Sequence, residues 1–305
     1  MSSHKNLMAV LAITVYSLTM LTACPSSQGV PDLTVVKVTP RVLMVVANDG
    51  FFFQEYFDPR RELETAGLQV FVASGLGGTA TPHLGSYHNH KNPANDYPDG
   101  IVPLEENRTI PSTLVLSQQA ANNYDALVIV GGWGAARYYF SYPGELDGSV
   151  SAFAPNTQEA LEMNRLIGEF LSAQKPVMGV CNGVNVLSWA RIDGKSPLDG
   201  VSISVPWGSA FPQSYPNPYP SGNLTAYTAN WTIDGACSNV PTADCFSMEK
   251  FATDNGALIR DDSTRTDPQS HARDLVFTEA GLIFTVQDNF AARAAGQRFA
   301  QRLLN

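Results

Sequence analysis

The sequence is poor in charge and in cysteine, and it has no basic cluster. Only 15% of its 305 residues are charged, and 19 Lys and Arg stand against 28 Asp and Glu, which gives a formal net charge of −9. A protein that binds nucleic acid needs a basic face to neutralise phosphate, so nucleic acid is excluded as a partner. The 4 cysteines are too few for a disulfide scaffold, and each must be interpreted separately.

Apolar residues, in contrast, make up 44% of the chain. This content excludes a disordered protein and provides enough apolar surface for one large or two small packed domains. The same composition, with a mean hydropathy near zero, excludes a multispan membrane protein. We find no internal repeat and no linker within residues 41–305, and we predict one domain there.

The first 23 residues have the layout of an export signal. They contain one lysine, no acidic residue and an apolar stretch over about residues 7–20, which is too short for a permanent spanning helix. Leu21, Thr22 and Ala23 precede Cys24, an arrangement that resembles the bacterial lipobox. We therefore predict a lipoprotein signal over 1–23, lipidation of Cys24, a tether over 24–40, and a periplasmic or membrane-anchored location. The alternative is an ordinary secretory signal followed by a chance cysteine.

Export changes the interpretation of two further cysteines. Cys237 and Cys245 lie eight residues apart in a stretch that contains Pro, Asn and Asp. Because disulfides persist outside the cytoplasm, we predict that these two residues form a disulfide across the loop. The alternative is a pair of buried thiols.

From residue 41 onwards short apolar runs alternate with amphipathic helices. This alternation predicts an α/β fold with a mostly parallel sheet covered on both faces. Two long stretches, near 75–123 and 206–250, do not fit the alternation and are expected to be insertions. The predicted strands are 41–47, 69–73, 125–130, 176–180 and a hairpin of 275–278 with 282–285, and the predicted helices are 54–66, one beginning after Asn156, and 289–304.

The sharpest motif is Gly179-Val-Cys181-Asn182-Gly183, between the predicted strand 176–180 and a helix. This is the nucleophile-elbow pattern with cysteine in the place of serine. The glycines suit a tight strand-to-helix turn. The free N–H groups and the dipole at a helix N-terminus favour thiolate, so we expect a reactive Cys181 with a low pKa. The alternative is a buried structural cysteine.

This motif, together with residues 124–132 and 48–59, resembles the ThiJ/PfpI family of the class I glutamine amidotransferase-like superfamily. The resemblance extends over residues 41–304 and is interrupted at the two long insertions. It implies a flavodoxin-like three-layer sandwich and a possible homodimer. It also implies that Glu55 faces the sulfur and hydrogen-bonds the thiolate best while it keeps its own proton.

Backbone N–H groups complete the site that the resemblance implies. In relatives such groups polarise a substrate oxygen, and here they would belong to Gly132 or Trp133 and to Asn182. From the residues alone, a simple loop glycine pair at 131–132 is about as good an interpretation. Glu55 could equally be a solvated carboxylate in a first helical turn.

The sequence departs from the family at the expected base. Members related to peptidases and glyoxalases place a histidine beside or against the cysteine, but here the neighbour is Asn182, which cannot take a proton. The amidotransferases use a downstream His-x-Glu, which is missing from the last third of this chain. His271 is the one histidine in that third, and it is either the base or a surface residue.

Three more histidines, His83, His88 and His90, cluster in a Gly- and Asn-rich loop. Their spacing makes them weak candidates for a divalent metal site. The alternatives are solvated side chains or a loop that folds over the cysteine and supplies the base. We predict no cofactor and no established metal site.

Two functions of different classes follow. The first is a cysteine-dependent enzyme, in which Cys181 attacks a small electrophilic carbonyl with assistance from Glu55, in glyoxalase-, deglycase- or amidase-type chemistry. The second is a non-catalytic redox-sensing or ligand-binding protein, in which an oxidant converts Cys181 to a sulfinate that Glu55 holds.

Overall fold

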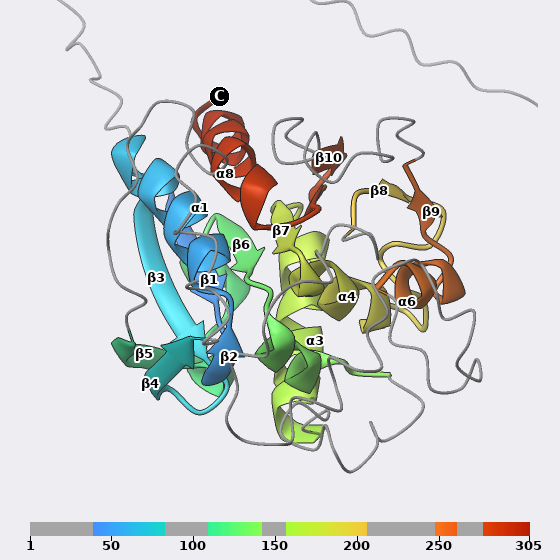
Figure 1. Ribbon diagram of the computed structural model, residues 1–305, viewed down its shortest axis with the longest axis horizontal. Coiled ribbons are helices and arrows are strands. Elements are labelled where there is room, and N and C mark those ends of the chain that lie inside the picture. The colour runs from blue at the N-terminus through green and yellow to red at the C-terminus, as the bar shows by residue number, and fades with distance from the viewer. Residues whose placement is uncertain (1–38, 83–108, 142–156, 206–247, 261–276) are drawn as a thin grey trace, which may run out of the picture. The chain divides into compact units, whose positions relative to one another are not determined.

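A nine-stranded sheet forms the centre of the structure (Figure 1). The computed structural model describes residues 39–82, 109–141, 157–205, 248–260 and 277–305. The order of strands across the sheet is β10 (Phe277–Ala280), β11 (Ile283–Val286), β7 (Val177–Val180), β6 (Ala126–Ile129), β1 (Arg41–Val45), β3 (Gln69–Ser74), β5 (Ile110–Val115), β4 (Gly78–Pro82) and β2 (Asp49–Phe51).

The middle of the sheet is parallel from β11 through β7, β6 and β1 to β3. Every residue of β6 and β7 is buried, as continuous apolar runs require when both faces of a sheet are covered. β10 pairs with β11 in antiparallel orientation, which is the hairpin expected from the sequence. The predicted α/β class with a mostly parallel, flavodoxin-like sheet is thereby confirmed.

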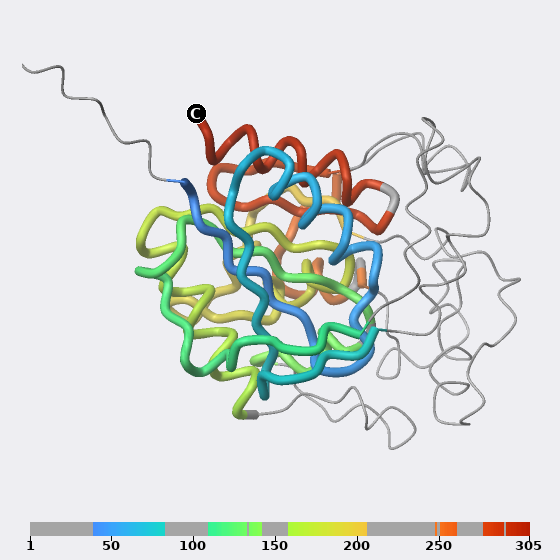
Figure 2. The backbone as a smooth tube through the Cα atoms, turned by 90° about the vertical axis from the view of Figure 1, so that its left-hand side faces the viewer, coloured from blue at the N-terminus to red at the C-terminus, as the bar shows by residue number. Residues whose placement is uncertain are grey.

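Helices cover the two faces of the sheet. α1 (Phe53–Thr65) and α8 (Asn289–Leu304) pack against each other on one face, as Figures 1 and 2 both show. α3 (Thr157–Ser172) and α4 (Asn182–Trp189) contact β6 and β7 on the other face. The apolar stripes predicted for two of these helices are buried or partly buried and comprise Ala160, Met163, Ile167, Phe170, Ala292, Ala295, Phe299 and Leu303.

Smaller elements complete the described chain. α6 (Met248–Asp254) packs on α4, next to the two-stranded sheet of β8 (Ser202–Ile203) and β9 (Leu258–Ile259). Short 3-10 helices follow β5 and β6, namely η2 (Leu116–Gln118), η3 (Ala121–Asn123) and η4 (Trp133–Tyr138). No helix in the described part of the chain is long and apolar enough to cross a membrane.

The structure differs from the sequence-based expectation in the stretch 75–123. Both ends of this predicted insertion are regular, because β4 and β5 add to the sheet beyond β3. β4 has Gly at its start and Pro at its end, and β5 contains Pro111, so neither has the uninterrupted apolar pattern that identifies a strand. Residues 83–108 and 206–247 of the insertions lie outside the described residues, as do the predicted signal and the tether up to residue 38.

Candidate active site

Cys181 lies in a sharp turn between β7 and α4. Its backbone has φ 52° and ψ −120°, a conformation that residues with a side chain rarely adopt. Cys181 is the residue directly before the first turn of α4. The Cys181 N–H donates to the Val286 carbonyl at 2.9 Å, and the Val184 N–H donates to the Cys181 carbonyl at 2.9 Å. A Cβ on Gly183 would collide with the Ile129 carbonyl, so glycine is required there. The predicted sequence of strand, turn and helix is therefore present, with the cysteine at its apex.

Glu55 reaches this turn from the first turn of α1. The start of α1 is fixed by the Phe52 N–H, which donates to the Gly131 carbonyl at 3.2 Å. A Cβ on Gly131 would lie 2.5 Å from Glu55 Oε2, 2.5 Å from the Val180 carbonyl oxygen and 2.8 Å from the Asn182 N atom. Three segments therefore meet at Gly131, and only a residue without a side chain allows the Glu55 carboxyl to approach the turn.

Burial favours the neutral form of the Glu55 carboxyl. Its side chain is 1% exposed, and burial raises its pKa well above the usual value. Hydrogen bonds with the Cys181 thiol and with the Gly131 backbone lower this pKa, while the negative charge of Asp288 raises it. Oε2 has no hydrogen-bond partner among the described residues. Without such a partner, a negative charge on this oxygen would be poorly stabilised. A protonated Glu55 can donate a hydrogen bond to the sulfur.

The Cys181 thiol differs from the sequence-based expectation. Its side chain is 4% exposed, and burial raises its pKa well above the usual value. A negative charge on Asp288, or on Glu55 when it is ionised, acts in the same direction, and the Asn182 backbone N–H acts in the opposite direction. The expected low pKa took account of the N-terminus of α4 but not of burial. Burial therefore favours the neutral form of both members of this coupled pair, Cys181 and Glu55.

Asn182, the residue after Cys181, joins two turns of the site. Its Nδ2 donates to the Gly132 carbonyl at 3.0 Å, and its Oδ1 accepts a hydrogen bond from the Tyr139 hydroxyl. The side chain therefore links the Cys181 turn to the turn that begins η4. Gly132 lies directly before η4 and Trp133 is its first residue. The expected role of the Gly132, Trp133 and Asn182 N–H groups as oxyanion donors stays a prediction.

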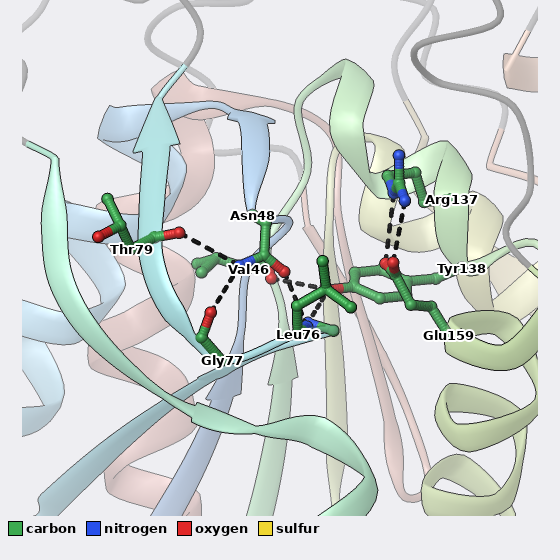
Figure 3. A network of polar contacts seen from close by, with 9 residues as sticks. Val46, Asn48, Leu76, Gly77, Thr79, Arg137, Tyr138 and Glu159 are labelled. Atoms are coloured by element: carbon green, nitrogen blue, oxygen red, sulfur yellow. Dashed lines mark hydrogen bonds and ion pairs between the residues drawn. The ribbon is translucent and has the colours of Figure 1, made fainter.

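A network of polar contacts joins η4 to neighbouring segments of the chain (Figure 3). The Tyr138 hydroxyl donates to the Val46 carbonyl at 2.8 Å and accepts from the Gly75 N–H at 3.0 Å. Next to it, Arg137 forms an ion pair of 2.9 Å with Glu159 at the start of α3. These contacts connect η4 to the residues that directly follow β1 and β3 and to α3, so the turn next to Cys181 is fixed on several sides.

Asp288 is a further acidic residue of this region, and the sequence analysis missed it. Val286 pairs with Val180 in the register of β11 and β7, so the residues that follow β11 emerge beside Cys181. Asp288 is 4% exposed, and its Oδ1 accepts the Ala291 N–H at 3.3 Å in the first turn of α8. An Asp before a helix was visible in the sequence as a helix cap, but its position near the cysteine depends on strand order, which the sequence does not show.

The other predicted site residues lie outside the described residues. These are the lipidation residue, the disulfide pair and the histidine candidates, namely Cys24, Cys237, Cys245, His83, His88, His90 and His271. Within the described ranges, no group of three or more His, Cys, Asp or Glu side chains could hold a metal ion. The roles predicted for these residues stay predictions.

Comparisons with known proteins bear on the fold. No family model matches the chain, and no curated protein sequence matches it. Among solved structures, the 24 kDa rapid encystment protein of Francisella tularensis is 14% identical, with a TM-score of 0.55 over 88% of this chain and 100% of that one. Glyoxalase III of Candida albicans is 14% identical, with a TM-score of 0.54 over 85% and 95%. The chain has the fold of these proteins. A ThiJ/PfpI domain protein of Brachyspira murdochii is 18% identical, with a TM-score of 0.48 over 87% and 95%.

Proposed function

We propose that this protein is a cysteine-dependent enzyme of the ThiJ/PfpI type that acts on a small electrophilic carbonyl compound. The observation that carries the proposal is the placement of the Glu55 carboxyl against the Cys181 turn, with the two side chains 1% and 4% exposed. A buried carboxyl that keeps its proton beside a thiol is suited to donate that proton to a developing alkoxide. The solved structure of a glyoxalase III with this fold agrees with such chemistry but does not identify the substrate.

The first step follows from the protonation states of the pair. The Asn182 N–H favours ionisation of Cys181. As the sulfur forms a bond to the carbonyl carbon, the thiol proton passes to the oxygen of the Glu55 carboxyl that carries no proton. The π electron pair of the carbonyl moves to its oxygen, which takes the proton from Glu55. The product of this step is a hemithioacetal with an aldehyde, or a tetrahedral adduct with an amide. With methylglyoxal the overall reaction adds one water and yields lactate, so no external oxidant is needed.

Turnover of methylglyoxal and of a panel of small aldehydes and amides by the full chain tests the enzyme. We expect turnover in the wild type and its loss in Cys181→Ser. Glu55→Gln keeps a hydrogen-bond donor but has no proton to transfer, so we expect a loss of about 10²- to 10⁴-fold. Ser188→Ala, a change inside α4 away from the turn, is the matched control and should retain the wild-type rate. Equal rates in wild type and Cys181→Ser would refute the proposal.

The second candidate function is a redox sensor, and Asn182 is the observation that favours it. Enzymes of this type place a histidine base beside or against the cysteine, and Asn182 cannot serve as that base, whereas oxidation of a thiolate needs no base. In this case two molecules of peroxide oxidise Cys181 to a sulfinate and are reduced to water, and protonated Glu55 donates a hydrogen bond to a sulfinate oxygen. Mass spectrometry after mild peroxide treatment tests this function. An unmodified Cys181 would exclude the sensor, and a sulfinate without turnover of any substrate would exclude the enzyme.

We further propose that the chain is exported and attached to a membrane through lipidated Cys24. The basis is the composition of residues 1–23 and the lipobox-like residues before Cys24. Labelling cells with a radioactive fatty acid should mark the wild type but not Cys24→Ser. Label in both proteins, or in neither, would contradict the anchor.

The proposed disulfide between Cys237 and Cys245 can be tested on the same variant. In denatured Cys24→Ser protein prepared under oxidising conditions we expect Cys181 as the one titratable thiol. Three titratable thiols would exclude the disulfide. The homodimer implied by the family resemblance is tested by sedimentation of the chain without its first 24 residues.

A further inference from the structure

Asp288 emerges at the same edge of the sheet as Cys181. The two strands that precede these residues are parallel neighbours, with Val286 opposite Val180. The Cys181 N–H donates to the Val286 carbonyl at 2.9 Å, so the chain leaving β11 runs alongside the Cys181 turn. Asp288 is two residues beyond Val286 and is 4% exposed.

The position of Asp288 stabilises a negative charge on its carboxyl. It directly precedes α8, which has 16 residues, and its Oδ1 accepts the Ala291 N–H at 3.3 Å. The side-chain Nε2 of Gln287 lies 3.4 Å from Oδ2 and donates to it. A helix N-terminus offers free N–H groups and the positive end of the helix dipole, both of which favour a carboxylate.

The start of α8 is also joined to the start of α1, which carries Glu55. Asn289 Nδ2 donates to Gln54 Oε1 at 3.0 Å, and Gln54 Nε2 donates to Asp58 Oδ2 at 3.3 Å. All of these side chains are buried. The link fixes the first turns of the two helices against each other, so the Glu55 and Asp288 carboxyls hold constant positions relative to Cys181.

Glu55 does not lie at a helix N-cap as Asp288 does, and the hydrogen bonds with the Cys181 thiol and the Gly131 backbone do not offset the effect of burial on its pKa. Its Oε2 has no hydrogen-bond partner among the described residues, and Gly131 leaves room for the carboxyl but offers no charge. The acidic groups that meet at this point are Glu55 from α1, Cys181 from the turn after β7, and Asp288 from the start of α8, with Asp58 one turn further along α1. A second negative charge in such a buried cluster is costly, so the best-stabilised group carries the charge and the others keep their protons.

We propose that Asp288 is a positioning residue that carries the negative charge of this cluster and thereby keeps the proton on Glu55, which then faces the Cys181 sulfur as a hydrogen-bond donor. The proposal rests on the proposed function, in which Glu55 supplies that proton. The negative charge of Asp288 raises the pKa of both Glu55 and Cys181, in addition to the larger effect of burial on each. Asp288 would therefore set the pH range over which Glu55 is a proton donor.

Infrared spectroscopy of the full chain tests the proposal without any substrate. The carbonyl stretching band of protonated Glu55 is assigned by its loss in Glu55→Gln, and its disappearance with rising pH gives the midpoint of Glu55 ionisation. In Asp288→Asn we expect the acid dissociation constant of Glu55 to rise about tenfold or more, so that the midpoint moves to lower pH. Asn is a good helix cap, so α8 should remain intact, and Asp288→Ser provides a second neutral cap if the first variant does not fold.

Asp58→Asn is the matched control, because it removes another buried carboxyl of α1. Asp58 accepts a hydrogen bond from Gln54, the residue directly before Glu55. We expect it to leave the midpoint of Glu55 unchanged. An unchanged midpoint in both Asp288 variants, or an equal shift in Asp58→Asn, would overturn the proposal. If the midpoint moves as expected but the wild type turns over no substrate, the proposed enzyme fails while the role of Asp288 stands. If turnover is present, its alkaline limb should move to lower pH in Asp288→Asn.

Discussion

Cys181 shows at the scale of one residue how the turn is maintained. Its φ of 52° with ψ −120° is a conformation that costs a side-chain-bearing residue about 1–3 kcal/mol. We therefore predict that the free energy of unfolding, measured by denaturant titration, is higher for Cys181→Gly than for Cys181→Ala by up to that amount. Both variants lack the thiol, so the difference reports on the backbone alone. At Ser188 inside α4 the order should reverse, with Ser188→Gly about 1 kcal/mol less stable than Ser188→Ala. The same order at both positions would show that the turn is unstrained.

Glu55 makes the stability of the protein depend on pH. Its pKa is raised in the folded state, so the folded protein binds its proton more tightly than the unfolded chain does. The stability that this proton contributes is complete below the unfolded pKa, which is about 4.3, and is lost as pH rises towards the folded pKa. We predict that Glu55→Gln raises the midpoint of thermal unfolding at pH 7–8 relative to wild type. The difference should shrink as pH falls towards 4, and a difference independent of pH would contradict a buried, protonated Glu55.

Asn185 is a buried polar residue of α4 whose amide has no hydrogen-bond partner for either polar atom among the described residues. A buried amide without partners costs about 1–3 kcal/mol. Asn185→Leu, which has a similar shape and no polar atoms, should therefore increase the free energy of unfolding. Equilibrium denaturation in urea measures the change. A loss of stability with normal packing would indicate that the amide is bonded in solution.

At the scale of elements, the packing of α1 against α8 brings Asp288 close enough to Glu55 for its charge to raise the Glu55 pKa. A Cβ on Gly296 of α8 would lie 2.7 Å from Pro59 Cα in α1, which is closer than real contacts allow. We predict that Gly296→Ala destabilises the protein by about 1–3 kcal/mol, despite the higher helix propensity of alanine. Gly168 in α3 is the matched control, because its added Cβ meets only the flexible end of Ile192 at 3.1 Å. Gly168→Ala should be neutral or stabilising, and equal effects at the two glycines would contradict the close approach of α1 and α8.

The elements that the sequence predicted well are those with a strong local pattern. β1, β6 and β7 are short apolar runs, and α1, α3 and α8 follow amphipathic or capped stretches, so their existence depended little on the rest of the molecule. β2, β4 and β5 were missed because they are short or contain proline and pack at one end of the sheet. The pairing of Glu55 with Cys181 came from the family resemblance. Asp288 and Tyr139 join the site only through strand order and the fold of η4, which no local pattern reveals.

At the scale of the whole molecule, the parallel strands at the centre of the sheet are the most deeply buried part of the described chain. The candidate site lies at the C-terminal ends of these strands. β1, β6 and β7 are almost entirely buried and each has a neighbour on both sides, whereas β8 and β9 form a separate two-stranded sheet of two residues each. Amide exchange should therefore be slowest in the three central strands and at least about tenfold faster in β8 and β9. Equal protection in both sheets would mean that the molecule unfolds as one unit.

The most direct test of the coupled pair is the rate of Cys181 alkylation against pH in wild type, Glu55→Gln and Glu55→Leu. A protonated Glu55 that donates to the sulfur is mimicked by the glutamine amide but not by leucine. We predict nearly equal rates at pH 7 for wild type and Glu55→Gln and a clearly lower rate for Glu55→Leu. A marked increase in rate in Glu55→Gln would contradict this prediction, because such an increase would mean that Glu55 is ionised and suppresses the thiolate.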